Sequence, residues 1–370
     1  MKNSIKNYIT PEKLIKKLKQ INWFNDIIEK LKNQNKSFYF VGGTLRDAII
    51  SIIFKTRFTP QDIDLVVELN NYEELLQLVN FFSFNKKVQI IKYPQFLTLS
   101  VIFYNKNNKR IDFALPRKEE YRDWGVLPQV AVGNIYEDLF RRDFSINSIA
   151  LRYDSLKRRF EILDPFGGIN DIFNKKIRVL HKKSFFDDPT RIIRSIRLLA
   201  KLNFYFEENT LSLLKEALEK KVFSYISKTR LANEFVNILK KGKNLDIVAF
   251  LFKEFNLIEV YSFIKEIISC FIRNCKKIEL DKINCEDTRY YIRLFYLLEA
   301  LSSQEEKSLS EKDKIVKFKK YLIELNIPRQ IREKIYKAVD IFSGKRKDAE
   351  LEEWMKLYVD IYKKKDITSF

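Results

Sequence analysis

Two aspartates that stand two residues apart carry the strongest chemical signal in the sequence. Asp62 and Asp64 lie in the segment 61–67, whose apolar, β-branched residues predict a short strand. Side chains two apart on a strand project from one face, and carboxylates so close repel unless a cation lies between them. The spacing predicts a Mg²⁺ site for phosphoryl-type transfer, although an isolated Asp-x-Asp also fits two solvated acids at a strand end.

A glycine pair upstream of these aspartates supplies a second signal. Gly42 and Gly43 separate the apolar run 38–41 from the start of a predicted helix. Glycines let the backbone approach a phosphate closely, and the N–H groups of the first helical turn point at the anion. Arg46 would add a charged donor. The pair alone also fits a plain tight turn, but its position before the aspartates favours a phosphate cradle.

A third acid, Asp112, lies in the run 111–114, which predicts another short strand. If this strand neighbours the first one, Asp112 completes a triad of metal-binding carboxylates. An acid between Ile111 and Phe113 equally fits a strand with one solvated face. The sequence leaves both interpretations open.

The segment 141–147 combines basic and polar side chains. On a helix, Asp143 and Asn147 share one face because they are four residues apart. Such a face can hold a ribose hydroxyl, with Arg141 or Arg142 reaching phosphate oxygens. A helix held only by structural ion pairs is the alternative interpretation.

A further helix start is predicted at Asp188 and Pro189, which fit the N-cap and the first helical position. Arg191 and Arg194 fall on a strip separate from the apolar one. A carboxylate and a guanidinium three residues apart can hydrogen-bond the edge of a base, and would thereby select a nucleotide without a nucleic-acid template. Asp188 as a simple cap is the competing interpretation.

The elements that must position these residues change character along the chain. Strands are predicted at 38–41, 63–67, 88–91, 97–104, 111–114 and 149–153, with helical periodicity at 71–82 and 137–147. Between Asn209 and Pro328, glycine and proline are nearly absent and apolar residues recur at intervals of three and four. The predicted fold class is α+β, a head with a small mixed sheet followed by an all-helical body.

Composition narrows the class of protein. A total of 69 Lys and Arg against 49 Asp and Glu gives a formal charge of +20, which favours nucleic-acid partners, although a lysine-rich composition arises without RNA binding too. The single histidine, His181, excludes a histidine-pair site and leaves carboxylates as the catalytic groups. Three cysteines without zinc or redox spacing, a polar N-terminus and no apolar run of about 18 residues predict a soluble cytoplasmic protein with no membrane contact.

Taken in order, the motifs resemble those of the class II tRNA nucleotidyltransferases, that is, the bacterial CCA-adding enzymes and the related bacterial poly(A) polymerases. The likeness rests on Gly42-Gly43-x-x-Arg46-Asp47, Asp62-x-Asp64, Arg141-Arg142-Asp143-Phe144-x-x-Asn147, Asp164-Pro165-Phe166-Gly167-Gly168 and Asp188-Pro189-x-Arg191-x-x-Arg194. The resemblance implies a nucleotidyltransferase head at 1–151, a helical neck for nucleotide selection at 152–222, and a helical body and tail that bind tRNA at 223–370.

The resemblance also implies roles for individual residues. It assigns metal binding to Asp62 and Asp64, and a protein template for incoming CTP and ATP to Asp187, Asp188 and Arg191. The chain departs from the family at Asp187, where CCA-adding relatives often carry Glu. The shorter side chain puts a base contact at this position in doubt.

The region 116–133, with Arg117, Glu119 and Tyr121, looks like the flexible loop that the family uses when it switches to adding A. Enzymes that add only CC tend to lack this loop, so its presence argues against CC-only activity.

The implied function is addition of CCA to the tRNA 3′ end by two-metal nucleotidyl transfer with release of pyrophosphate. An A-adding enzyme or a poly(A) polymerase is the alternative within the class. A non-catalytic RNA-binding protein is a rival from another class, and the paired acids Asp62 and Asp64 speak against it. The sequence leaves the oligomeric state open.

Overall fold

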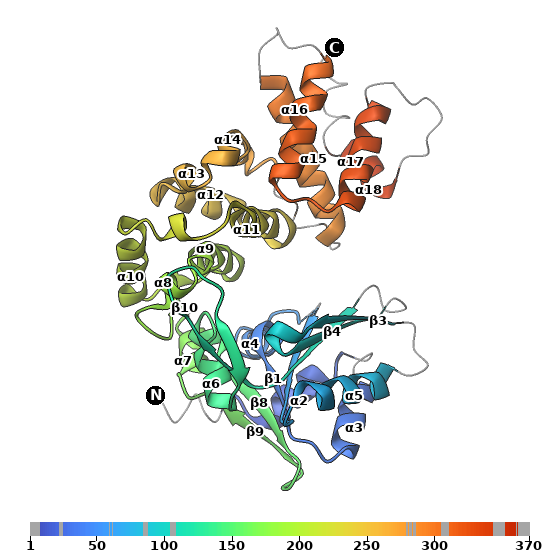
Figure 1. The fold of residues 1–370 in the computed structure, drawn as a ribbon, viewed down its shortest axis with the longest axis vertical. Helices are drawn as coiled ribbons and strands as arrows, with labels where there is room; N and C mark the ends of the chain where they lie inside the picture. The colour runs from blue at the N-terminus through green and yellow to red at the C-terminus, as the bar shows by residue number, and fades with distance from the viewer. Residues whose placement is uncertain are drawn as a thin grey trace. The chain divides into compact units, whose positions relative to one another are not determined.

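The computed structural model describes residues 8–21, 25–58, 60, 62–83, 88–103, 109–278, 280, 283, 286–304, 311–342, 352–359 and 361. The chain divides into two compact units. Unit 1 comprises Met1–Asp188 and Tyr205–Leu214, and unit 2 comprises Pro189–Phe204 and Lys215–Phe370. Within the described ranges, unit 1 holds every strand and unit 2 is helical (Figure 1).

Unit 1 is built on a seven-stranded mixed sheet with the strand order β3-β4-β5-β2-β1-β8-β9. The strands are β1 (Phe38–Val41), β2 (Asp62–Val67), β3 (Val88–Tyr93), β4 (Thr98–Phe103), β5 (Lys109–Ala114), β8 (Ala150–Asp154) and β9 (Arg159–Leu163). Strands β2 and β5 run parallel, whereas the other neighbours are antiparallel. All six predicted strands are present. The edge strand β9 was not predicted, although Phe160 and Ile162 alternate with Arg159 and Glu161 over its five residues.

The centre of the sheet is apolar on both faces, which explains the unbroken run of large side chains in β1. All four β1 residues are buried. Tyr39, Val41 and Val66 pack against Ile135 and Leu139 in one buried cluster. Ile63, Leu65 and Val67 alternate with these positions along β2 and are buried as well. The sheet is therefore a rigid support for the polar residues at the start of β2.

Helices and short strands complete unit 1. They are α2 (Pro11–Leu18), α3 (Asn25–Asn33), α4 (Gly42–Ile53), α5 (Tyr72–Ser83), η2 (Pro94–Phe96), β6 (Arg117–Glu120), β7 (Gln129–Val132), α6 (Ile135–Phe140), η4 (Ser145–Asn147), α7 (Gly168–Phe173), β10 (Lys176–Ile177), α8 (Ser184–Asp187) and β11 (Tyr205–Phe206). Helix α4 follows β1 without a loop and packs on β1, β2 and β8, while α5 packs on β4 and β5. The prediction of a helix over 71–82 is confirmed by α5.

The prediction of a continuous helix over 137–147 is wrong. Helix α6 ends at Phe140, and the chain then turns into the short 3-10 helix η4. Phe144 forms an isolated β-bridge with Val179, and its N–H donates to the Asp143 carboxylate at 2.9 Å. These contacts satisfy backbone groups that a helix would have paired internally, so tertiary structure overrides the local periodicity.

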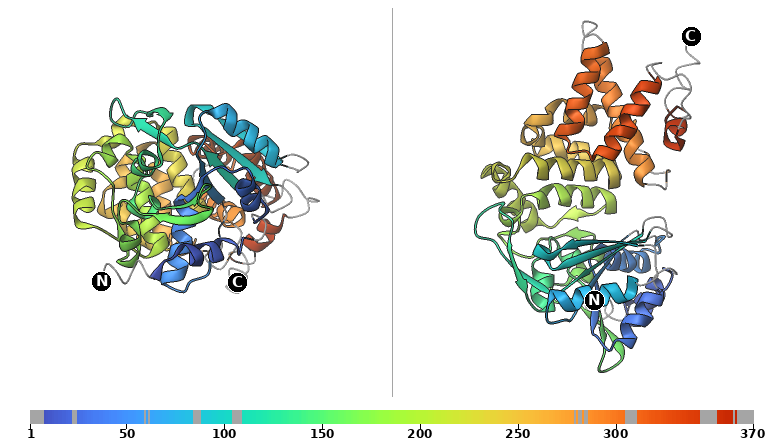
Figure 2. Two further views of the ribbon diagram at one scale, coloured as in Figure 1. Left: turned by 90° about the horizontal axis from the view of Figure 1, so that it is seen from below. Right: turned by 45° about the vertical axis from the view of Figure 1, so that its right-hand side comes forward.

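Unit 2 consists of helices, as the spacing of its apolar residues predicts (Figure 2). They are α9 (Thr190–Leu202), the second part of α10 (Glu208–Glu219), η5 (Val222–Tyr225), α11 (Lys228–Lys241), α12 (Leu245–Glu254), α13 (Leu257–Val260), η6 (Ser262–Ile264), α14 (Lys265–Asn274), α15 (Glu286–Gln304), α16 (Glu311–Glu324), α17 (Arg329–Phe342) and α18 (Glu353–Tyr358). Helix α11 packs against α9 and α15, and α14 packs against α15. Among the described helices, none is both long and apolar enough to cross a membrane.

The predicted division into head, neck, and body with tail at 151 and 222 stays a prediction. Strand β8 runs across residue 151, and β9 follows it in the same sheet. The sheet of unit 1 therefore continues into the segment predicted as the neck.

Candidate active site

The glycine turn lies directly against an aspartate of β2. Helix α4 begins at Gly42, whose φ of 70° belongs to the left-handed region that favours glycine. A Cβ atom on Gly42 would lie 2.4 Å from Oδ2 of Asp64, so a side chain at this position would overlap the carboxylate. Only glycine lets the start of α4 approach Asp64 this closely.

Strand pairing brings three carboxylates to one place. In the parallel pair of β2 and β5, Asp64 stands opposite Asp112. Asp62 precedes Asp64 by two residues and lies on the same face of β2. Burial raises the pKa of Asp64 to about 6, the charges of Asp112 and Asp62 add to this increase, and the charge of Arg142 opposes it. A half-buried carboxylate among like charges fits a site that a cation would stabilise.

Asp112 has protein partners for both of its oxygens. The Ser100 hydroxyl donates to Oδ1, and Nη2 of Arg110 lies 2.9 Å from Oδ2. The same Arg110 nitrogen lies 3.9 Å from Oδ2 of Asp62. In the part of the chain that the structure describes, no group of three His, Cys, Asp or Glu residues is arranged to hold a metal ion. A metal role for Asp112 stays a prediction, because Arg110 would have to release it.

Thr44 anchors the glycine turn and was missed in the sequence. Its buried hydroxyl donates to the backbone carbonyl of Asp62, which joins the first turn of α4 to the start of β2. A threonine directly after a glycine pair at a helix start was the available signal.

Arg46 is held by protein partners, and its predicted contact with a phosphate stays a prediction. Its side chain is buried, with Nη2 2.6 Å from Oδ1 of Asp47 and Nη1 donating to Oδ1 of Asn147 at 2.7 Å. Asn147 in turn donates from Nδ2 to Oδ1 of Asp143 at 2.8 Å. The predicted pairing of Asp143 and Asn147 therefore exists, but it is made by a turn, and Arg46 ties it to α4.

Asp138 organises the two adjacent arginines and was also missed. Its side chain is fully buried, and its oxygens lie 2.8 Å from Nη2 of Arg141 and 2.8 Å from Nη2 of Arg142. Burial alone would raise the pKa of Asp138, but the two guanidinium charges lower it below its ordinary value. The three- and four-residue spacing to the arginines was a signal that the sequence offered.

The region predicted as a flexible loop forms a hairpin of β6 and β7. Glu119 contacts the other two residues predicted for this loop. It lies 3.0 Å from Nη2 of Arg117 and accepts a hydrogen bond from the Tyr121 hydroxyl at 2.9 Å. It also accepts from Nη1 of Arg141 at 3.1 Å. The base of the hairpin is therefore attached to the segment that carries the two arginines, and a movement of this region stays a prediction.

The tip of the hairpin contacts α8. The N–H of Gly125 donates to the carbonyl of Phe186 at 3.0 Å, and the rings of Trp124 and Phe186 lie 4.8 Å apart between centroids. Phe186, which makes this contact, directly precedes Asp187 in the sequence.

The second glycine pair serves packing near the turn that holds Asp143. Asp164 accepts from the N–H of Gly168 at 2.6 Å and from the N–H of Ile169 at 3.1 Å, which caps α7. A Cβ on Gly168 would lie 2.2 Å from the carbonyl oxygen of Ser145. Glycine at this position lets α7 support the segment 143–148.

The predicted nucleotide-selecting residues straddle the end of unit 1. Asp188 is extended, Pro189 has helical dihedral angles, and α9 begins at Thr190, so the chain enters a helix where predicted. Asp187 lies 3.8 Å from Nδ1 of His181 through Oδ2. Asp188 ends unit 1, whereas Arg191, which is buried, and Arg194 belong to unit 2. Their role in selecting a base stays a prediction.

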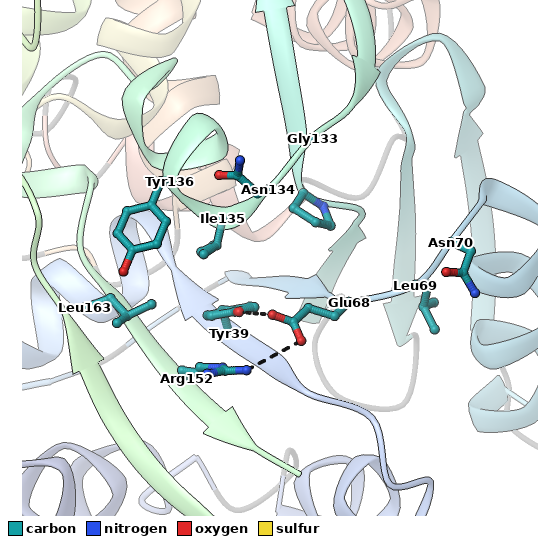
Figure 3. Close-up of a pocket in the computed structure, with 11 residues that line it drawn as sticks. Tyr39, Glu68, Leu69, Asn70, Gly133, Asn134, Ile135, Tyr136, Arg152 and Leu163 are labelled. Carbon is teal, nitrogen blue, oxygen red and sulfur yellow. Dashed lines mark hydrogen bonds and ion pairs between the residues drawn. The ribbon is translucent and has the colours of Figure 1, made fainter. Parts of the chain in front are cut away.

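A pocket of about 490 Å³ lies at the far end of β2 from Asp62 (Figure 3). Glu68 occupies its wall, accepting from the Tyr39 hydroxyl and lying 3.7 Å from Nη2 of Arg152. None of the predicted site residues lines this pocket. The residues that could take part in catalysis therefore lie at the glycine turn, and not in this pocket.

Comparison with known proteins finds a family model that resembles part of unit 1. Residues 38–178 match the family described as the poly A polymerase head domain. Nucleotidyltransferases with this head generally use divalent metal ions, in agreement with the acidic cluster at Asp62 and Asp64.

Proteins similar to this chain include tRNA nucleotidyltransferases. The A-adding tRNA nucleotidyltransferase of Aquifex aeolicus is 29% identical over 314 residues, which cover 84% of this chain and 35% of that protein. The CCA-adding enzyme of Francisella tularensis subsp. novicida is 31% identical over 215 residues, or 56% of this chain and 51% of that enzyme. The chain thus spans about a third to a half of these relatives' lengths.

The likeness to solved structures extends beyond residues 38–178. The Thermotoga maritima CCA-adding enzyme complexed with tRNA matches 93% of this chain and 78% of its own, with a TM-score of 0.55 and 25% identity. A CCA-adding enzyme in an apo form matches 96% of this chain and 81% of its own, with a TM-score of 0.58 and 25% identity. The predicted α+β head with a helical remainder is confirmed.

Proposed function

We propose that this chain is a tRNA nucleotidyltransferase that adds CCA to the tRNA 3′ end from CTP and ATP without a nucleic-acid template. One observation carries the proposal: the Asp64 carboxylate lies against the Gly42 turn, at the N-terminus of α4, with Asp62 beside it on the strand. Such a place can hold a triphosphate and a cation together. The names of the relatives support tRNA as the substrate, and a cytoplasmic location belongs to the same proposal.

Each group in the cluster has a part in the proposed reaction. The N–H groups that follow Gly42 and Gly43 bind phosphate oxygens, and Asp143 with Asn147 holds the ribose. Asp62 and Asp64 would hold Mg²⁺, which would supply positive charge for the developing phosphorane and the leaving group. The 3′-hydroxyl oxygen forms a bond to the α-phosphorus, the bond from that phosphorus to the bridging oxygen breaks, pyrophosphate leaves, and the hydroxyl proton passes to water.

Selection of the base is assigned to the start of α9 in this proposal. Asp188 and Arg191 would hydrogen-bond the base edge, with Asp187 and Arg194 adjacent to them. The hairpin residues Arg117, Glu119 and Tyr121 would act when addition changes from C to A.

An extension assay on three RNAs tests the function. Purified protein is given tRNA transcripts that end before the first C of the CCA sequence, transcripts that end after CC, and an unrelated RNA, with CTP and ATP supplied separately and together. CCA addition predicts CTP use on the first transcript, ATP use on the second, and no extension of the unrelated RNA. Extension of the unrelated RNA with ATP would instead identify a poly(A) polymerase.

An A-adding enzyme is the second candidate, because the relative from Aquifex aeolicus that aligns with 84% of this chain carries that name. ATP use on the CC-ended transcript with no CTP use on the shorter one would establish it and refute CCA addition.

A further inference from the structure

The adjacent residues Arg141 and Arg142 differ in how much of each guanidinium is used by the protein. Arg141 donates from Nε and Nη2 to Oδ1 of Asp138 at 3.1 and 2.8 Å, and from Nη1 to Oε1 of Glu119 at 3.1 Å. All three nitrogens of Arg141 therefore bind carboxylates of the protein.

Arg142 gives only part of its guanidinium to the protein. Nη2 donates to Oδ2 of Asp138 at 2.8 Å, whereas Nε is buried without a hydrogen-bond partner among the described residues. Nη1 lies 3.3 Å from the point where a Cβ on Gly42 would stand. The charge of Arg142 also acts on the Asp64 carboxylate. Arg142 thus holds donor capacity at the glycine turn.

We infer that the two arginines have separate functions, and that Asp138 is a positioning residue for Arg142. Arg142 binds the phosphate groups of the incoming nucleotide, while Arg141 is a strut that links Asp138 to Glu119 of the hairpin. This inference rests on the proposed function for the identity of the nucleotide, and on the contacts above for the division of labour.

The arrangement of charges explains why one buried acid serves both arginines. Asp138 offers one oxygen to each guanidinium, and its full burial excludes water that would compete for those bonds. A long side chain such as Arg142 otherwise samples many rotamers, so a fixed anchor at Nη2 lowers the entropy lost when Nη1 meets a phosphate. Removing the anchor should therefore weaken phosphate binding without removing a group that touches the nucleotide.

Direct binding measurements separate the two functions. Binding of ATP and of inorganic tripolyphosphate is measured by calorimetry for the full chain and for Arg142→Lys, Arg141→Lys and Asp138→Asn. Arg142→Lys and Asp138→Asn should each weaken both ligands by roughly tenfold, because each disturbs the same guanidinium. Arg141→Lys should change both affinities less than about threefold while lowering Tm, since it weakens the link to Glu119.

A double variant gives the decisive comparison. In Asp138→Asn combined with Arg142→Lys, affinity should fall no further than in Arg142→Lys alone, because Asp138 acts through Arg142. Additive losses, or an equal loss of affinity in Arg141→Lys, would overturn the inference. If Asp138→Asn does not fold, Asp138→Glu replaces it, and its affinity for tripolyphosphate should lie between those of the wild type and Arg142→Lys. An affinity equal to that of the wild type, or below that of Arg142→Lys, would overturn the inference.

This test stays separate from the proposed function. Tripolyphosphate carries no base or ribose, so its binding reports on Arg142 even if no RNA is extended in the assay. Absence of extension together with the expected binding pattern would refute tRNA addition and keep the assignment of the arginines.

Discussion

The two units differ in the charges that they bury. Among described residues, unit 1 buries the aspartates Asp138, Asp143, Asp154 and Asp171 together with Arg46, whereas the buried charged side chains of unit 2 are all arginines. The arginines are Arg191, Arg289 and Arg293. Burying a charge costs desolvation free energy in both units. The hydrogen-bond and ion-pair partners of each buried charge therefore show what its burial stabilises.

In unit 1 the buried acids organise cations and backbone donors near the glycine turn. Asp138 receives two guanidinium groups, and Asp143 receives Asn147 and a backbone N–H. In unit 2, Arg293 donates to carbonyls of Leu239, Gly242 and Ile278, where helix α11 and a turn end. Buried charge in unit 1 therefore shapes a site, and in unit 2 it completes the backbone hydrogen bonding of packed helices.

The largest expected effect is the loss of nucleotide incorporation when the two aspartates of the site in unit 1 are replaced. Replacing Asp62 and Asp64 together by Ala should lower nucleotide incorporation by about a thousandfold or more, because the groups that would hold the cation are gone. Affinity for tRNA should stay within about threefold, since the substitutions lie in unit 1. Incorporation by the double variant at the wild-type rate would remove the proposed site.

A large effect on stability is expected from the buried arginine of unit 2. Arg293→Met would leave carbonyl groups of Leu239, Gly242 and Ile278 without their donor, which should lower the free energy of unfolding by about 3 kcal/mol. Urea denaturation measures this change. The control Arg329→Met alters an exposed pair with Glu333 and should change stability by less than about 0.5 kcal/mol. Equal effects of the two variants would contradict the contrast between buried and exposed arginines.

A smaller effect follows from the raised pKa of Asp64. Between its ordinary value of 3.8 and about 6, the folded protein holds a proton on Asp64 that the unfolded chain has released. Stability without a divalent ion should therefore fall as the pH rises from about 4 to about 6, by about 1 to 3 kcal/mol. Asp64→Asn should remove this fall, and Mg²⁺ should restore stability to the wild type at pH 8 but not to this variant. A wild-type stability that rises across this window in step with the variant would refute it.

The smallest effect is expected at an exposed ion pair. Nζ of Lys220 lies 2.6 Å from Oε1 of Glu216, with about half of each side chain exposed. Glu216→Gln should change the free energy of unfolding by less than about 0.5 kcal/mol, because water screens the pair. A loss above about 1 kcal/mol would show that exposed charge also supports the helices.

Short motifs and periodicity predicted much of the fold. Alternation and apolar runs located the six strands, and the spacing of apolar residues located the helical half. Prediction failed at 141–147, because the bridge between Phe144 and Val179 is formed by residues distant in the sequence. It failed again at β9, where the alternation of apolar and charged residues is only five residues long.

The sequence predicted which residues gather at the candidate site, but it did not predict all of their contacts. The closeness of Gly42 to Asp64 follows from the order of strand, turn and strand, and the structure supports it. The partners of Arg46 and Asp112 were not predictable, because Asn147 and Arg110 reach them through the folding of separate segments.

By itself the sequence determined which residue types stand at each strand end and helix start, because backbone geometry near a glycine pair or a proline is set by local sterics. Only the tertiary structure decided which charges meet. Asp138 divides its two oxygens between neighbouring arginines, and Asp64 faces Asp112 across two strands. Electrostatic pairing depends on distances through space and on burial, and neither quantity is written in the order of residues along the chain.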